Sequence, residues 1–188
     1  MRKAIAFIAL ALLLAGGAAA QDGGSKLSAT LTGNILFPSD AGYRDTYGSA
    51  RFYPEIRVAY AIQKGFFLYA AYGFLSASGT TPVLEAEASS TQHVLSLGGG
   101  IGGPLTGKLS YKAGLGLFLG LYKEEAMEIE VSGSAIGLRL DAGICYSLTD
   151  KIGIQAGLGY QMASDTTDDD VKIKLGGFRL GAGVGYKF

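Results

Sequence analysis

The chain ends in the sequence FRLGAGVGYKF, residues 178–188, in which every second residue is apolar. A period of two indicates a β-strand with two unlike faces. A strand of a soluble protein rarely places an aromatic residue such as Phe188 at its very end, where chains fray. The pattern therefore predicts that the last strand lies against an apolar medium. Its apolar face consists of Phe178, Leu180, Ala182, Val184, Tyr186 and Phe188.

The composition of the 188 residues fits one folded domain with a processed leader. Hydrophobic residues make up 48% and charged residues only 17%, which does not suit a disordered chain. The formal net charge is zero, so no basic field points to nucleic acid. Cys145 is the single cysteine, which excludes an intramolecular disulfide.

The first 20 residues have the pattern of a secretory signal peptide. Arg2 and Lys3 precede the apolar run IAFIALALLLA, and Ala18–Ala20 supply the small residues of a cleavage site. The run is too short to span a bilayer comfortably, which disfavours a membrane anchor. We therefore predict residues 1–20 as a cleaved signal peptide and residues 21–188 as an exported domain that begins at Gln21.

Seven earlier stretches join the last one to give eight predicted strands, an even number. Most alternate clearly, but residues 66–75 are apolar on both phases, so their register cannot be read. After Gln21 no helical pattern is visible. The predicted strands cover residues 27–37, 52–62, 66–75, 93–101, 109–122, 136–148, 152–162 and 178–188.

The breaks between these strands alternate between short and long. QKG, GGPLTGK and TDK are short, whereas residues 38–50, 76–90, 123–130 and 163–170 are mostly longer and more polar. Strict alternation places all the long loops at one end, as in transmembrane barrels with short periplasmic turns. We therefore predict an all-β fold, an eight-stranded antiparallel up-and-down transmembrane β-barrel.

The two faces of the strands agree with this fold. One phase is rich in leucine, isoleucine, valine and aromatics, which suits lipid, and the other in glycine and polar residues. Small inward residues leave room for Phe118, Tyr122 and Arg139 in a narrow lumen. Phe188 then joins Tyr111 and Tyr146 in a periplasmic aromatic belt. A soluble periplasmic binding barrel is the alternative and requires the large apolar phase to point inward.

With these features the chain resembles the small eight-stranded outer-membrane barrels, the OmpA/OmpX-like and opacity-protein group, and more distantly the OmpW-like barrels. The resemblance covers roughly Lys26 to Phe188. It implies an outer-membrane location, with lipid and lipopolysaccharide around the barrel. It also implies that Val184, Tyr186 and Phe188 are the C-terminal signal that the barrel-assembly machinery reads.

One register conflict concerns the eighth strand. Counting back from Phe178 places Lys172 and Lys174 on the lipid phase and turns Ile173 inward. A bulge at Gly176–Gly177 would reverse the phase, and we favour it. The alternative leaves both lysines outward above the membrane, near lipid phosphates.

Several charged residues share the inward phase and are the candidate site residues. Arg139 and Asp141 are two apart, so both point into the lumen from one strand. We favour a mutually paired plug over a polar track for solutes, because buried charges need partners. The predicted interior network consists of Glu55, Arg57, Lys112, Arg139, Asp141 and Arg179.

The sequence gives little support for an active site, a metal site or a cofactor. His93 and Ser96 are an odd number apart and project to opposite faces of a regular strand. Ser89 and Thr91 share the phase of His93, but no oxyanion hole is recognisable. Asp165 and residues 168–170 are acidic but lack EF-hand spacing. We predict His93 as an interface residue at a strand start.

The predicted role is structural, adhesive or surface-interacting, through extracellular loops that contact a host or envelope protein. The first alternative is a narrow, porin-like pore or a conduit for small apolar molecules, which needs an open lumen or a gap between strands. The second is a lipid-modifying enzyme, which needs His93, a serine and an acid such as Glu85 or Glu87 together on the outer face.

Overall fold

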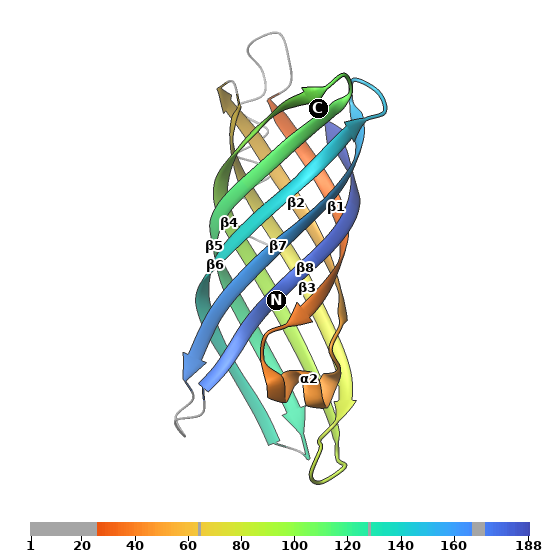
Figure 1. Cartoon of the computed structure of the whole chain (residues 1–188). Helices are drawn as coiled ribbons and strands as arrows, with labels where there is room; N and C mark the ends of the chain where they lie inside the picture. Colours follow the sequence, from red (N-terminus) through yellow and green to blue (C-terminus); the bar gives the residue numbers. More distant parts are fainter. Residues whose placement is uncertain (1–25, 64, 128, 167–171) are drawn as a thin grey trace.

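The computed structural model describes residues 26–63, 65–127, 129–166 and 172–188. Eight strands and one short helix make up this part of the chain (Figure 1). The strands are β1 (Leu27–Pro38), β2 (Arg51–Gln63), β3 (Phe66–Thr80), β4 (Glu87–Thr106), β5 (Leu109–Ala126), β6 (Ile129–Ser147), β7 (Ile152–Thr166) and β8 (Lys172–Lys187), and the helix is α2 (Ala41–Tyr47). The predicted signal peptide, residues 1–20, lies outside the described residues.

The strands form one closed barrel in chain order. Every strand pairs antiparallel with its neighbours in sequence, and β1 closes the sheet by pairing with β8. Closure leaves no sheet edge along the wall, as a hydrocarbon environment requires. The predicted eight-stranded up-and-down barrel is therefore confirmed.

The large apolar side chains point outward. Leu31, Leu97 and Ile136 are 64%, 61% and 72% exposed, although each lies in the middle of a strand. The inward phase of the same strands carries buried polar residues such as Asn34 and Ser96. A soluble binding barrel is therefore wrong for this chain, because its apolar phase would have to face the interior.

The register of β3, which the sequence leaves open, is set by its neighbours. Tyr69, Ala71 and Leu75 point inward and are buried, whereas Tyr72 and Phe74 point outward. Both phases are apolar because the outward residues face lipid and the inward ones pack in the lumen. Pairing with β2 and β4, and not the pattern of β3 itself, decides which phase is which.

The long breaks predicted at one end are mostly strand. Residues 123–126 belong to β5 and residues 129–130 to β6, and the β3–β4 connection shrinks to residues 81–86. The prediction of long loops is therefore wrong at these two places. Paired strands there project beyond the barrel wall at the end opposite the C-terminus (Figure 1).

The predicted absence of helix is also wrong. Helix α2 forms in the β1–β2 connection, where the Asp40 side chain caps it by accepting a 2.9 Å hydrogen bond from the Tyr43 amide. Gly48, at φ 94°, ends it. At seven residues the helix is too short to produce a readable period, so pattern alone could not reveal it.

The bulge predicted at Gly176–Gly177 does not occur. The β7–β8 ladder runs without a shift through Gln161↔Gly177 and Met162↔Gly176, so the phase is never reversed. Leu175 is therefore inward and only 4% exposed. Lys174 is outward and exposed, as the alternative reading had it. Gly177 is required because an added Cβ would collide with the Phe37 carbonyl of β1.

The final residue is held in place. The amide of Phe188 donates a 3.1 Å hydrogen bond to the Leu27 carbonyl, and its ring packs edge-on against Tyr186 at 5.2 Å. Tyr111 and Tyr146 are also exposed on the outer surface at the end with the short turns. The four rings occupy the positions expected of a periplasmic aromatic belt.

In the described part of the chain, no α-helix is long and apolar enough to cross a membrane.

Candidate functional site

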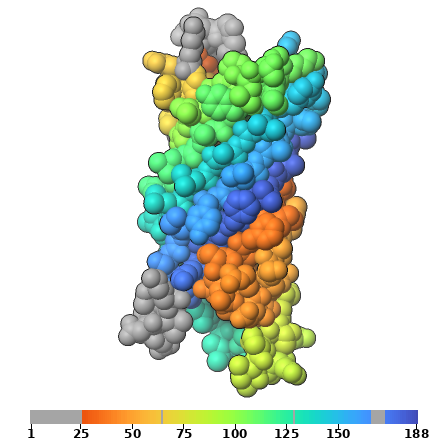
Figure 2. All heavy atoms as spheres, viewed as in Figure 1, coloured from red at the N-terminus to blue at the C-terminus, as the bar shows by residue number. Residues whose placement is uncertain are grey.

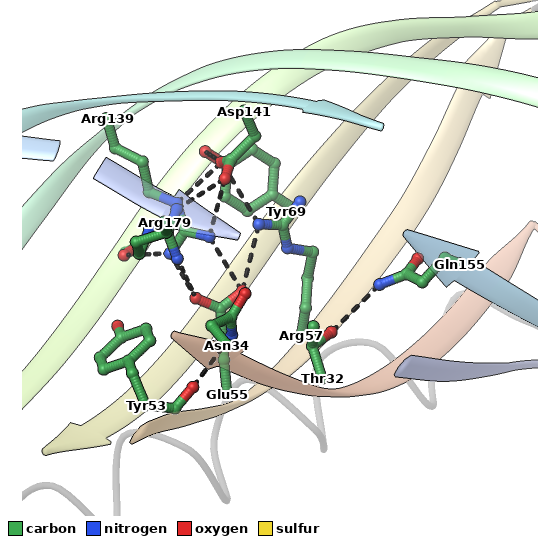
Figure 3. Close-up of polar contacts among 11 residues, drawn as sticks. Thr32, Asn34, Tyr53, Glu55, Arg57, Tyr69, Arg139, Asp141, Gln155 and Arg179 are labelled. Carbon is green, nitrogen blue, oxygen red and sulfur yellow. Dashed lines mark hydrogen bonds and ion pairs between the residues drawn. The ribbon is translucent and has the colours of Figure 1, made fainter. Parts of the chain in front are cut away.

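Five of the six predicted interior charges meet in the middle of the lumen (Figure 3). Two carboxylates, Glu55 and Asp141, face three guanidinium groups, those of Arg57, Arg139 and Arg179. We call these five residues the central cluster. They come from β2, β6 and β8, and no two of these strands are neighbours in the barrel.

Arg139 is the centre of the cluster and is 1% exposed. Its guanidinium lies 2.7 Å from Glu55 Oε2 and 2.7 Å from Asp141 Oδ2. Arg179 joins the same two carboxylates, at 3.0 Å to Glu55 and 2.7 Å to Asp141. Each buried carboxylate therefore has several charged donors, which satisfies the need for pairing in a narrow lumen.

Neutral side chains complete the shell of the cluster. Ser96 Oγ accepts a 3.1 Å hydrogen bond from Arg139. The ring of Tyr69 lies under Arg57, whose guanidinium carbon is 4.5 Å from the ring centroid. Sequence reasoning missed Tyr69 because β3 has no readable phase, and it considered Ser96 only as a partner for His93.

Lys112 is the sixth predicted member and does not join the cluster. No ion pair or hydrogen bond links it to another described residue, although it points inward and lines the cavity beside the cluster. It lies nearer the periplasmic end, two residues before Gly114, which pairs with Asp141. The inward phase was predicted correctly, but its membership of the network was wrong.

The extracellular half of the lumen is filled with apolar side chains. Leu36, Tyr53, Leu75, Val94 and Phe118 form one buried layer next to the cluster, and Tyr122, Ala135 and Leu175 form another. Glycines make room for the rings, since a Cβ at Gly137 would meet Phe118 at 2.6 Å. This agrees with the predicted pairing of large and small inward residues.

Helix α2 covers the mouth above these layers. Tyr47 is 4% exposed and packs with Ala77 and Ala88, and its hydroxyl donates to the Ser89 carbonyl at 3.3 Å. Burial raises the pKa of Tyr47 to about 12, and the nearby charge of Glu124 adds to the effect. The phenol is therefore neutral at any physiological pH and serves as a packed lid.

The periplasmic half has a different lining. Inward positions of β4 to β8 are mostly glycine from the level of the cluster downward: Gly98, Gly100, Gly102, Gly114, Gly116, Gly143, Gly153, Gly157, Gly159, Gly181, Gly183 and Gly185. A cavity of about 70 Å³ lies here, bounded on one side by the cluster. It does not continue through the apolar layers.

His93 does not form the catalytic pair that an enzyme would need. It points to the exterior, where its Nδ1 lies 2.8 Å from the Tyr72 hydroxyl, whereas Ser96 points into the lumen. The predicted opposite orientation is confirmed. His93 is opposite Leu121, the last outward leucine of β5, which suits an interface position. It is not at a strand start, because β4 begins at Glu87.

No three His, Cys, Asp or Glu side chains gather as a metal site in the part of the chain that the structure describes. Asp165 accepts a 2.9 Å hydrogen bond from the Tyr122 hydroxyl. The acidic residues 168–170, which lack EF-hand spacing, lie outside the described residues. Cys145 is a partly buried, inward-facing free thiol beside the cavity.

A closed eight-stranded barrel with an apolar exterior and a charged, glycine-rich interior defines the class of outer-membrane barrel proteins. The chain belongs to the outer membrane protein beta-barrel domain family, whose family model matches residues 8–188. The family indicates an outer-membrane location, with lipid and lipopolysaccharide around the barrel. No curated protein matches the chain.

Solved structures of low sequence identity show the same fold. Neisserial surface protein A is 17% identical with a TM-score of 0.63, and the match covers 89% of this chain and 100% of that one. OprG from Pseudomonas aeruginosa is 14% identical with a TM-score of 0.66, covering 88% and 97%. Ail of Yersinia pestis, solved with the heparin analogue sucrose octasulfate, is 17% identical with a TM-score of 0.55, covering 89% and 100%.

Proposed function

We propose that this chain is a sealed outer-membrane barrel with a structural and adhesive role, whose contacts are made at its extracellular end. The observation that carries the proposal is the closed lumen. The central cluster and the apolar layer around Tyr53 and Phe118 lie across it in succession. A sealed interior leaves the outer wall and the extracellular end as the surfaces available for function.

The extracellular end projects above the lipid-facing band. On β5 the outward residues change from Leu119 and Leu121 to Lys123 and Glu125, and on β6 Glu130 and Ser132 precede Ile136. The paired ends of β4, β5 and β6 therefore extend into water. We call residues 38–51, 80–91, 123–127, 129–134, 164–166 and 172–174 the extracellular rim.

The tip of the rim is unusually apolar for a surface in water. Met127, Ile129 and Val131 are 49%, 63% and 40% exposed, and Val83 and Leu84 in the neighbouring connection are 89% and 63% exposed. In space-filling view the β3–β4 and β5–β6 connections form the lower tip of the molecule (Figure 2). Exposed apolar patches of this kind are typical of interaction surfaces.

The rim also carries an open sheet edge. β6 pairs with β5 from Ile129 onward, but its ladder with β7 begins only at Gly137. Among the described residues, positions 129–136 of β6 thus pair on one side alone. An extended segment of a partner can add to such an edge through main-chain hydrogen bonds. The edge supports contact with a protein partner.

The charge of the rim favours a cationic partner over a polyanion. Acidic residues outnumber basic ones there: Asp40, Asp45, Glu85, Glu87, Glu124, Glu125, Glu130 and Asp165 against Arg44, Arg51, Lys123, Lys172 and Lys174. Lys123 is further occupied by a 2.9 Å ion pair with Glu130. A sulfated sugar such as the one bound to Ail would therefore meet repulsion over most of this rim.

The geometry does not favour the two alternatives. A conduit needs an open lumen or a gap in the wall, yet the cavity ends at the cluster and the eight strands pair around a closed barrel. The register shifts in the described ladders lie at the short-turn end, at Ala61/Gln63 and Pro104/Thr106. A lipid-modifying enzyme needs a serine and an acid beside His93, whose hydrogen-bond partner is Tyr72.

Export and assembly complete the proposal. Residues 1–20 act as a signal peptide that is removed before Gln21, and the barrel-assembly machinery recognises Val184, Tyr186 and Phe188. The three side chains are 54%, 41% and 55% exposed on the outer wall at the periplasmic end. A receptor could therefore read them on one face of β8 before the barrel closes. Deleting Phe188 should lower the amount of heat-modifiable barrel in outer-membrane fractions, and an unchanged amount would contradict the signal.

Two measurements test the sealed, adhesive barrel. In planar bilayers, the purified protein should give no steady conductance. Displayed on non-adherent diderm cells, it should increase attachment to an epithelial cell layer, and the double change Ile129→Ser with Val131→Ser should remove the increase because it deletes the apolar inner face of the hairpin.

The matched control changes the other face of the same strand, with Ser132→Ala and Ser134→Ala, and should attach like the parent. Surface amounts of the three proteins are compared by protease shaving of intact cells. A steady pore-like conductance in the parent protein, or equal attachment of both variants at equal surface amounts, would contradict the proposed function.

A further inference from the structure

The charges inside the lumen do not balance. The central cluster contains three guanidinium groups and two carboxylates, and Lys112 lines the same cavity. These six residues leave a formal excess of two positive charges in the lumen. Because the strand wall and the apolar layers exclude water on the other sides, this excess is poorly screened.

The excess faces the periplasmic cavity. Within the cluster, Arg57 is the most exposed guanidinium, with 21% of its side chain exposed against 1% for Arg139 and 3% for Arg179. Arg57 lies between the cluster and the Gln155–Thr32 pair in the close-up view (Figure 3). Lys112 lines the cavity from β5 and has no carboxylate partner among the described residues.

Arg57 and Lys112 give the cavity its cationic side. The neutral side chains of the lining are Thr32, Asn34 and Gln155, and the two amides are engaged as donors, Asn34 to the Tyr53 carbonyl and Gln155 to the Thr32 hydroxyl. The two carboxylates that border it are already engaged, since Glu55 and Asp141 accept from Arg139 and Arg179. The Nε of Arg179 is buried and has no hydrogen-bond partner. Such a lining attracts a negative ligand and repels a cation.

We propose that the periplasmic cavity binds a small anion of halide size between Lys112 and Arg57. Its volume of about 70 Å³ is enough for one such ion with ordered water, because about 10–15 Å³ on this measure is enough for one water. Glycines on β4 to β8 leave space in the lower lumen, into which the Phe67 ring projects beside the cavity. The ion offsets part of the buried excess charge, so it stabilises the folded barrel. This site is independent of any contact at the extracellular rim.

The first experiment measures thermal unfolding of the purified barrel by its gel mobility. Sodium chloride or sodium bromide is compared with sodium gluconate at equal ionic strength, since gluconate is too large for the cavity. The midpoint temperature should rise saturably with halide, by about 3 °C once the halide is tenfold above its dissociation constant.

Two variants separate the site from a general salt effect. Lys112→Gln should lose the halide dependence and should be more stable than the parent in gluconate, because the unpaired charge is gone. Lys108→Gln, in the nearby periplasmic turn, changes the same charge outside the cavity and should keep the parent response. A halide response of equal size in all three proteins, or none in the parent, would overturn the proposal.

Crystals grown in bromide give a direct readout. An anomalous peak should lie within contact distance of Lys112 Nζ and the Arg57 guanidinium in the parent, and should be missing from Lys112→Gln crystals. An empty cavity in the parent at high bromide would overturn the site, whatever the unfolding data show.

Discussion

The two halves of the lumen are built from the same strands but packed in opposite ways. The extracellular half is filled by large side chains such as Tyr53, Leu75 and Phe118 and is covered by α2. The periplasmic half is lined mostly by glycine and contains a cavity. The backbone ladders close the barrel in both halves, apart from positions 129–136 of β6, which pair on one side alone among the described residues. Closure of the wall and closure of the lumen are therefore separate properties, and the second depends on side chains.

The central cluster separates the two halves, and its loss should have the largest effect. Glu55→Gln leaves three guanidinium groups against one carboxylate at a position only 3% exposed. Breaking one partner of a buried ion pair costs about 3–5 kcal/mol of unfolding free energy. Urea unfolding in lipid vesicles measures this loss.

Glu125→Gln is the control for that change, because Glu125 is exposed on the outer face of the rim. It should leave the unfolding free energy nearly unchanged. A loss in Glu55→Gln no larger than in the control would show that the cluster does not stabilise the boundary between the halves.

The second largest loss of unfolding free energy is expected from a substitution in the apolar, extracellular half of the lumen. Leu75 is 1% exposed within the layer above the cluster, so Leu75→Ala should leave a cavity and lower the unfolding free energy by about 2–5 kcal/mol. Leu84→Ala, at a 63% exposed position in the β3–β4 connection, is the control and should cost little. Equal unfolding curves for the two variants would contradict tight packing in this half.

Two alanine substitutions on the inward face of β8, at Gly183 and Gly185, test why the periplasmic half is rich in glycine. A Cβ at Gly183 would collide with the Leu31 carbonyl and lie 2.8 Å from the Thr32 Cα, both backbone atoms. A Cβ at Gly185 would first meet the Thr30 hydroxyl, at 3.3 Å. Gly183→Ala should therefore cost about 1–3 kcal/mol and Gly185→Ala less, measured by the same unfolding. A larger loss of unfolding free energy at Gly185 than at Gly183 would mean that these glycines keep the lumen wide and do not relieve contacts between backbones.

The sequence predicts the faces of most strands because lipid and lumen demand unlike residues. At β6, for example, Leu138 and Leu140 point outward while Arg139 and Asp141 point inward, as the alternation indicates. The sequence places Glu55 and Arg139 in one interior network, but their direct contact could not be predicted, because they lie 84 residues apart and only the stagger of the strands brings them to one level. Lys112 shares the right phase but lies too near the periplasm to reach a carboxylate.

Other features could not be predicted because no local pattern encodes them. β3 is apolar on both faces, so the inward position of Tyr69 follows only from its ladders with β2 and β4. At Gly176–Gly177 the sequence offers two glycines that suit a bulge, yet the continuous ladder with β7 keeps the phase. Gly177 is glycine because β1, at the other end of the chain, approaches too closely to leave room for a side chain.

The smallest expected effect concerns the lid over the filled half. Glu124 is a rim residue that points inward, and burial, followed by the charge of Asp40, raises its pKa above the ordinary value. A raised folded-state pKa means that this group favours folding below its unfolded pKa, and that the contribution is lost as pH rises through the folded pKa. Glu124→Gln should therefore flatten the fall in midpoint temperature as pH rises above the ordinary carboxyl pKa of about 4, whereas Glu125→Gln, its exposed neighbour, should follow the parent. Parallel profiles for Glu124→Gln and the parent would show that the lid accommodates the charged carboxylate as readily as the neutral one, and that only the apolar layers beneath it seal this half.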